Sequence, residues 1–224
     1  ERLASLDVRP INLMVDITNY VMLCVGEPTH AFDAMHVEGG IVVRRAETGE
    51  KLTLLNDEVV ELCDSDLLIA DKVKALALAG VMGGKLDSVL DDTQAVILEV
   101  ANFDAIGTRR TATRLGVRTE SSSRFEKALD TQRVDQALGM TVALLNELMP
   151  EARFTGFTDV IKKETQALLV PVSKDYLEKR LGSTLEVDEV QALLGRLGFE
   201  MTFADGVFTC HVPSWRATGD VSLP

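Results

Sequence analysis

The sequence has few cysteines and histidines, and neither type is spaced as in a known kind of site. Its 224 residues include three cysteines, Cys24, Cys63 and Cys210, which lie far apart and form no C-x-x-C pair. An odd, scattered set argues against a disulfide framework and favours reduced cysteines in a cytosolic protein. The histidines also lack the short spacing typical of metal ligands (His30, His36 and His211).

Long apolar runs and a signal peptide are absent as well. No apolar stretch approaches the ~20 residues that a membrane-spanning helix needs, and the first residue is Glu1. We therefore expect a cytoplasmic segment of a longer chain, with no membrane partner. The hydrophobic content of 46% is ample for a core, and 224 residues suffice for one large domain or for a medium and a small one.

Positive charge is scarce over most of the chain. The net charge of −12 argues against indiscriminate binding to a phosphate backbone. One segment departs from this balance, because five arginines between Arg109 and Arg124 stand against a single acid, Glu120. A solvated helix face and a docking patch for RNA phosphates are two interpretations that charge alone does not separate.

Common catalytic motifs are missing. The sequence contains no G-x-S-x-G, no H-E-x-x-H and no convincing Ser-His-Asp order. The glycine-rich stretch from Gly80 to Gly84 is not a phosphate-binding loop, since no Lys-Ser/Thr pair follows in register. Glycines there allow positive φ and a close backbone approach, but on spacing alone the motif is weak and favours a tight structural turn.

The most organised stretch runs from Arg9 to Asp33. Pro10 suits the first position of a helix, and Gly26 and Pro28 suit its end. Apolar residues between them recur at helical spacing: Ile11, Met14, Val15, Thr18, Val21, Met22 and Val25. Such a helix delivers the segment from Pro28 to Asp33, with His30, to a fixed place. The segment is either a device for positioning polar groups or a surface turn after a core helix.

Short strands follow this helix. We expect strands at 41–45, 67–70 and 75–79, and a hairpin of 51–55 with 59–62 around Asn56-Asp57. A further strand at 95–100 carries Glu99 among apolar residues. A carboxylate in such a run either points to solvent or is buried with a partner.

Helices dominate the next part of the chain. The pattern predicts a helix over 104–115 that carries the basic face, then a polar loop from Thr119 to Ser123. Asp130 is the expected cap of a long helix that runs to about Leu148.

The last part has a different character. We expect a strand at 168–172, a helix from Ser173 to Leu181, a second helix at 187–197, and a hairpin around Asp205-Gly206. This order is similar to a winged helix, but residues 173–200 hold four basic and six acidic side chains, which disfavours DNA binding. The predicted fold is α+β: a mixed, mostly antiparallel sheet domain with helices at 1–155, and a small winged-helix-like module at 156–224, truncated at its C-terminus.

Several separated motifs resemble one known family in the same order. They are RPINLMVDITNYVM with EPTHAFD, ALAGVMGG at 77–84, ILEVANFD at 97–104, RTESSSRFEK at 118–127 and PSWR at 213–216. They are similar to the B3/B4 domain and the start of the B5 region of the bacterial phenylalanyl-tRNA synthetase beta subunit. The resemblance covers essentially the whole chain. It implies an editing domain that hydrolyses tyrosine wrongly attached to phenylalanine tRNA.

The resemblance also implies which residues act. His30 and Glu99 would be catalytic, Glu99 would accept a hydrogen bond from the tyrosine phenol, and Arg109, Arg110, Arg114 and Arg118 would bind RNA. The implied substrate pocket comprises Asn19, Pro28, Gly80, Glu99, Thr119 and Ser121. Ser121 departs from the family, in which alanine is common at this position.

The resemblance implies partners and cofactors for a larger assembly. These are the acceptor end of the phenylalanine tRNA, the synthetase alpha subunit in a heterotetramer, and ATP with Mg²⁺ for ligation. We expect no cofactor for the segment itself, which should not aminoacylate alone. Asp220 matches one magnesium ligand, but one carboxylate does not make a tight site. A non-catalytic module that binds RNA or a partner subunit is the alternative, and a DNA-binding regulator is the least favoured one.

Overall fold

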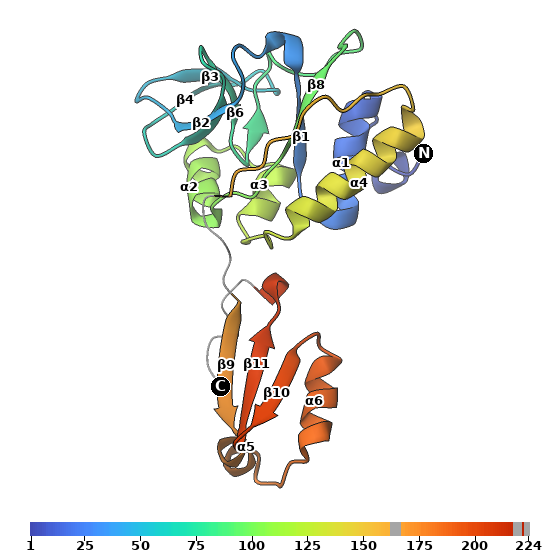
Figure 1. The fold of residues 1–224 in the computed structure, drawn as a ribbon. Helices are drawn as coiled ribbons and strands as arrows, with labels where there is room; N and C mark the ends of the chain where they lie inside the picture. Colours follow the sequence, from blue (N-terminus) through green and yellow to red (C-terminus); the bar gives the residue numbers. More distant parts are fainter. Residues whose placement is uncertain (162–166, 217–220, 222–224) are drawn as a thin grey trace. The chain divides into compact units, whose positions relative to one another are not determined.

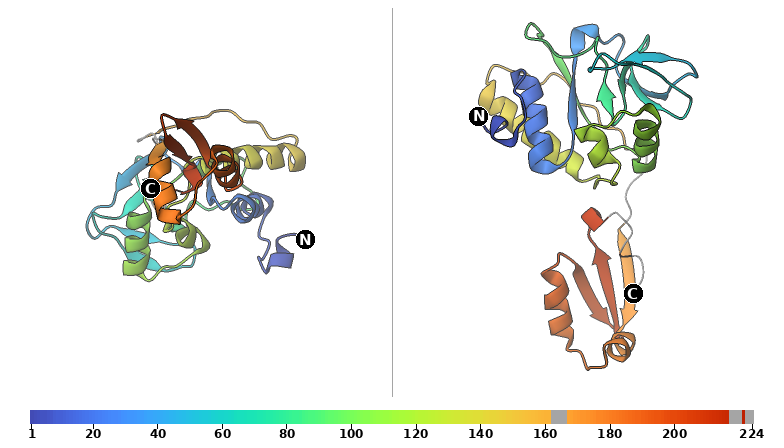
Figure 2. Two further views of the ribbon diagram at one scale, coloured as in Figure 1. Left: turned by 90° about the horizontal axis from the view of Figure 1, so that it is seen from below. Right: turned by 180° about the vertical axis from the view of Figure 1, so that it is seen from behind.

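The chain divides into two compact units, Glu1–Gly156 and Phe157–Pro224, in the computed structural model (Figures 1 and 2). The structure describes residues 1–161, 167–216 and 221. Its strands pair antiparallel and are accompanied by helices, so the predicted α+β class is confirmed. Within the described ranges, no helix has the length and apolar content needed to cross a membrane.

The first long helix, α1, spans Leu13–Val25. The Asn12 side chain accepts a hydrogen bond from the Val15 backbone N–H at 2.9 Å and so caps the helix. The prediction that the helix begins at Pro10 is therefore wrong, and Ile11 lies outside the apolar face with 68% of its surface exposed. At the other end Gly26 adopts the left-handed conformation with φ of 83°, as the sequence predicted.

The segment after Pro28 is a strand, which the sequence analysis did not predict. This strand, β1 (Thr29–Asp33), pairs antiparallel with β8 (Val96–Val100). Helices α1 and α4 (Arg133–Leu148) pack against each other beside this two-stranded ribbon (Figure 1). Their shared core comprises Met14, Ile17, Val21, Ala31, Val89, Ala137 and Leu145. This packing holds β1, and the side chains it carries, in a fixed position.

The first unit also contains a four-stranded sheet, separate from the β1–β8 ribbon. Its order is β2 (Val42–Arg45), β5 (Leu67–Ala70), β6 (Ala75–Leu78) and β7 (Met82–Gly83). The predicted hairpin is confirmed as β3 (Lys51–Thr53) paired with β4 (Val59–Glu61). Short 3₁₀ helices lie at Ala4–Leu6, Ala34–His36 and, in the second unit, Ser214–Arg216.

Two helices follow β8. Helix α2 (Ala105–Leu115) begins at Asp104, whose carboxylate accepts from the Gly107 N–H at 2.6 Å. Helix α3 (Glu120–Phe125) replaces the polar loop expected at Thr119–Ser123. Serine has modest helix propensity, but Thr119 and Ser122 form a reciprocal capping box and Phe125 is buried. Tertiary packing therefore stabilises a helix that the local sequence does not favour.

The predicted cap of α4 is wrong. The helix begins at Arg133 with Gln132 at its N-cap position and no side-chain cap. Asp130 accepts a hydrogen bond from the Gln132 N–H at 3.1 Å, so it belongs to the preceding turn.

The second unit is a three-stranded sheet with two helices. Its order is β10 (Glu200–Ala204), β11 (Val207–Val212) and β9 (Leu168–Ser173), with α5 (Lys174–Leu181) and α6 (Val187–Gly195) between β9 and β10 in sequence. Asp205 and Gly206 both have positive φ, as the predicted hairpin turn requires. Val170, Phe199 and Cys210 form the core. The winged-helix assignment stays a prediction.

One buried carboxyl lies at the junction of α1 and β1. Glu27 has no exposed surface, and neither of its carboxyl oxygens has a hydrogen-bond partner among the described residues. Burial raises the pKa of Glu27 to about 8, although the positive charge of Arg133 opposes the shift. The folded protein therefore holds Glu27 as a neutral acid at pH 7.

We predict that Glu27→Gln removes a loss of stability that the wild type undergoes as the pH rises from 5 to 8. Because the folded-state pKa of about 8 lies above the ordinary glutamate pKa of 4.5, the folded state binds the proton more tightly than the unfolded state. The free energy of unfolding should therefore fall as the pH rises from 5 to 8. Glutamine stays neutral, so the free energy of unfolding of the variant should fall by on the order of 2 kcal/mol less than that of the wild type over this range. Urea unfolding at several pH values measures the free energy of unfolding, with a substitution at an exposed position, Glu147→Gln, as control. If the free energy depends on pH in the same way in Glu27→Gln and in the wild type, the prediction is wrong.

Candidate functional site

A cavity opens where the β1–β8 ribbon, the turn after β6 and helix α3 meet in the first unit. Its empty volume is about 370 Å³, its mouth included. Its walls combine a few polar groups with apolar side chains: Pro28, Thr29, His30, Ile69, Ala77, Leu78, Ala79, Gly80, Val81, Met82, Gly83, Glu99, Phe103, Ser121 and Phe125.

His30 and Glu99 are direct partners across the two strands. The antiparallel register places His30 opposite Glu99, between the pairs Thr29–Val100 and Ala31–Leu98. Residues directly opposite in an antiparallel pair lie on the same face of the sheet. Both side chains line the cavity, so the strand register brings together an imidazole and a carboxyl that are 69 positions apart in the sequence.

Burial sets the charge state of both groups. Desolvation raises the pKa of Glu99 to about 7 and lowers the pKa of His30 to about 4. No hydrogen bond from the described residues reaches either side chain, although the His30 ring packs edge-on against Phe32 with centroids 4.6 Å apart. At neutral pH the imidazole is therefore neutral, and about half of the Glu99 carboxyls are ionised. Each group has hydrogen-bonding capacity left for a ligand.

The turn after β6 forms one side of the cavity. Gly80 has a positive φ of 69°, and a Cβ there would lie 3.0 Å from the Phe103 ring and 3.1 Å from the Thr108 hydroxyl. Thr119 fixes the same turn, because its hydroxyl donates to the Val81 carbonyl at 2.7 Å. The positive φ thus favours glycine at position 80, and a side chain there would also press against Phe103 and Thr108.

Most residues of the expected pocket line this cavity. Pro28, His30, Gly80, Glu99 and Ser121 are among its wall residues. Asn19 and Thr119 are not. Asn19 lies half-buried on α1, and the Thr119 hydroxyl is used in capping α3 and in bonding Val81.

Several wall residues were not singled out from the sequence. Phe103 and Phe125 pack edge to face with ring centroids 5.0 Å apart and form an aromatic side of the cavity. Thr29, Met82 and Gly83 belong to quoted motifs but carried no expected role. Two of these could have been predicted from their motifs, because Thr29 directly precedes His30 and Gly83 follows Gly80 by three residues.

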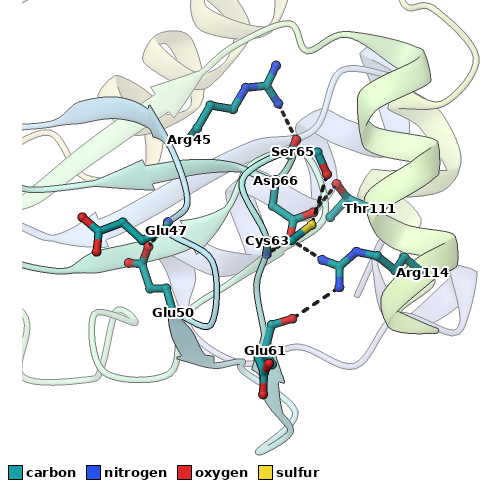
Figure 3. A network of polar contacts seen from close by, with 9 residues as sticks. All are labelled: Arg45, Glu47, Glu50, Glu61, Cys63, Ser65, Asp66, Thr111 and Arg114. Atoms are coloured by element: carbon teal, nitrogen blue, oxygen red, sulfur yellow. Dashed lines mark hydrogen bonds and ion pairs between the residues drawn. The ribbon is translucent and has the colours of Figure 1, made fainter.

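The expected basic patch is partly used within the protein. Arg114 forms an ion pair with the buried Asp66 and donates to the Glu61 carbonyl at 3.3 Å (Figure 3). Asp66 also accepts from the Thr111 hydroxyl at 2.8 Å and from the Cys63 N–H at 2.9 Å. Arg114 therefore ties α2 to the sheet, and its charge is compensated.

The other arginines of the patch are more accessible. Arg109 and Arg110 are exposed, and neither has an ion pair or hydrogen bond with the described residues. Arg118 is highly exposed at its side chain and lies 3.4 Å from the Glu126 carboxylate. Arg118 also donates from Nε to the Ser123 hydroxyl at 3.3 Å, so its charge is partly engaged within the protein.

The described residues contain no group of three or more His, Cys, Asp or Glu side chains that could hold a metal ion. Asp220, the expected magnesium ligand, lies outside the described residues. The cavity itself offers only His30 and Glu99 as donors of this kind.

Known proteins match the chain in both units. Residues 1–150 match the family model of the B3/4 domain, and residues 170–223 match that of the tRNA synthetase B5 domain. The phenylalanine–tRNA ligase beta subunit of Solibacter usitatus is 41% identical over 227 residues, which cover 99% of this chain and 29% of that protein. Its counterpart in Streptococcus pyogenes serotype M28 is 42% identical over 223 residues, which cover 99% and 27%.

A solved structure is also similar. It is an N-terminal fragment of the phenylalanyl-tRNA synthetase beta subunit from Pyrococcus horikoshii, with 16% identity and a TM-score of 0.43, and the match covers 90% of this chain and 60% of that one. The chain spans less than a third of the length of the two bacterial relatives above. With a B3/4 domain over two thirds of its residues and a B5 domain after it, the chain belongs to the phenylalanine–tRNA ligase beta subunit family.

Proposed function

We propose that the Glu1–Gly156 unit hydrolyses tyrosine that has been wrongly esterified to the phenylalanine tRNA. The observation that carries this proposal is the unpartnered Glu99 carboxyl, opposite His30, in the wall of one cavity. A desolvated carboxyl without a protein partner is costly unless a ligand supplies a donor. A phenol is such a donor, and the aromatic side of the cavity suits its ring.

The physical need for this activity follows from the difference between the two amino acids. A hydrophobic pocket does not strongly reject a near-isostere that merely adds a hydroxyl, so a phenylalanine site admits some tyrosine. A second pocket built around the hydroxyl reverses the preference. Phenylalanine would leave the Glu99 carboxylate desolvated and unpaired, at a cost of roughly 1–3 kcal/mol.

His30 is suited to orient water and not to take up a full proton. With a pKa of about 4, its imidazole is a weak base, but in the neutral ring one nitrogen donates a hydrogen bond and the other accepts one. In the hydrolysis, the water oxygen bonds to the ester carbonyl carbon and the bond to the ribose oxygen breaks. The ribose oxygen leaves with a proton from the water. An aminoacyl ester is reactive, so positioning supplies a large part of the required rate.

The larger assembly is part of the same proposal. Arg109, Arg110 and Arg118 would contact phosphates near the acceptor end of the tRNA. The whole synthetase, with its alpha subunit, would ligate phenylalanine to the tRNA with ATP and Mg²⁺. A module that only binds RNA or a subunit would leave the deacylation rate unchanged, which separates the two functions.

We predict that Glu99→Ala lowers kcat/KM for Tyr-tRNA hydrolysis about 10- to 100-fold, because it removes a hydrogen bond worth about 1.4–2.8 kcal/mol to the phenol. Hydrolysis of Phe-tRNA should change much less. Release of labelled amino acid from each tRNA by the assembled synthetase measures both rates, with the exposed Glu147→Ala as a matched control. A variant that keeps the wild-type preference for tyrosine would overturn the role of Glu99.

We also predict that the preference for tyrosine rises with pH. Since the pKa of Glu99 is raised to about 7, the ionised fraction in the free enzyme grows from roughly a tenth at pH 6 to roughly nine-tenths at pH 8. The ratio of kcat/KM for Tyr-tRNA to that for Phe-tRNA should follow this titration. The ratio cancels the alkaline lability that both esters share. In Glu99→Gln the ratio should be independent of pH; the same titration in that variant would assign it to another group.

Ser121 should matter less. Its side chain lies in the cavity wall on α3, and its hydroxyl has no hydrogen bond with the described residues. We expect Ser121→Ala to change Tyr-tRNA hydrolysis less than tenfold, that is by less than about 1.4 kcal/mol. If this change proves more damaging than Glu99→Ala in the same assay, the serine performs the role assigned to the carboxylate.

A further inference from the structure

Leu55 is an exposed apolar residue whose side chain lies close to the His30 ring. The point at which a Cβ would stand on Gly83 is 3.2 Å from Cδ1 of Leu55 and 2.8 Å from Nε2 of His30. The Leu55 methyl group and the Nε2 edge of the imidazole therefore border the same narrow gap. Leu55 is 45% exposed and is not one of the wall residues of the cavity. It therefore borders the gap from the solvent side.

The loop between β3 and β4, which carries Leu55, is fixed to the end of β7. The Leu55 N–H donates to the Gly83 carbonyl at 3.1 Å, and the Lys85 N–H donates to the Thr53 carbonyl at 3.0 Å. The Lys85 side chain also forms an ion pair with Asp57 of the loop. These contacts hold the Leu55 side chain beside the ring.

The surroundings of His30 make an apolar cover important. Glu99 lies opposite His30 on β8, and the charged groups of the loop, Asp57 and Lys85, pair with each other. Burial is what lowers the pKa of His30 to about 4. Because Leu55 stands between the gap and solvent, its side chain contributes to this desolvation.

We propose that Leu55 is a positioning residue that shields the Nε2 edge of His30 from bulk solvent, so that this edge contacts only water held in the cavity. This inference rests on the proposed function in one respect, namely that His30 orients the water for hydrolysis. A single exposed leucine usually needs no explanation, but this one is fixed by its backbone beside a ring of the site. Truncation at Cβ would open the gap to solvent.

Chemical modification measures the shielding without any hydrolysis assay. Diethyl pyrocarbonate acylates neutral, accessible imidazole nitrogens, and mass spectrometry of peptides from the assembled synthetase reports His30 and the exposed His36 separately. In the wild type His30 should react more slowly than His36. In Leu55→Ala the rate at His30 should rise by about threefold or more, because water and reagent gain access to the ring. The rate at His36 should not change.

Two further variants separate shielding from a general loosening of the hairpin. Leu55→Met keeps an apolar side chain of similar volume and should restore the slow reaction of His30. Val59→Ala, at a position 64% exposed on β4 of the same hairpin, should leave that rate unchanged. The proposal is overturned by a wild-type His30 as reactive as His36, by an unchanged rate in Leu55→Ala, or by an equal rise in Val59→Ala.

Hydrolysis of Tyr-tRNA by the assembled synthetase tests the consequence for the reaction. Leu55→Ala should lower kcat by about threefold or more and change KM by less than about twofold, because solvent at Nε2 competes with the positioned water. Leu55→Met should restore kcat, and Val59→Ala should not change it. An unchanged kcat, or a loss confined to KM, contradicts the positioning role. A wild type without hydrolysis refutes the proposed function, while the acylation rates still decide whether Leu55 shields His30.

Discussion

The antiparallel register of β1 and β8 is the constraint on which the site depends. It places His30 opposite Glu99 and puts both on the face that lines the cavity. A slip of one residue would turn the His30 side chain to the opposite face of the ribbon, away from the cavity. The register is held by α1 and α4, which pack on the ribbon through Val21, Ala31 and Ala137. The core therefore determines which polar groups meet.

Most helices and strands could be predicted from the sequence, but not which of them meet at the cavity. The Gly26 helix end and the Asp205-Gly206 hairpin were predictable because each depends on local backbone chemistry. Strand β1 was not, because a five-residue strand after Pro28 is stabilised by its partner β8 and not by its own pattern. Only the family resemblance brought His30 and Glu99 together. Pairing of distant strands depends on tertiary packing, which periodicity does not encode.

The number of arginines in a segment also does not show how much of their charge is exposed. Five arginines between positions 109 and 124 suggested one basic patch. In the structure Arg114 neutralises the buried Asp66, and Arg124 pairs with Glu120 one helical turn away. A charged residue paired with a buried partner adds little external field, and its removal would leave the buried charge uncompensated. Part of the positive charge counted in the sequence is therefore balanced within the folded unit, and the uncompensated patch is smaller than the sequence implies.

The two carboxyls with strongly raised pKa values show how position decides function. Glu27 and Glu99 are both desolvated, and neither has a hydrogen-bond partner among the described residues. Glu27 has no exposed surface and lies outside the cavity wall, so a ligand in the cavity has no access to it. Glu99 retains some exposed surface in that wall, so a ligand can supply the missing donor. Desolvation only destabilises the ionised form at Glu27. At Glu99, under the proposed function, the same desolvation is the source of selectivity for a hydroxyl-bearing substrate.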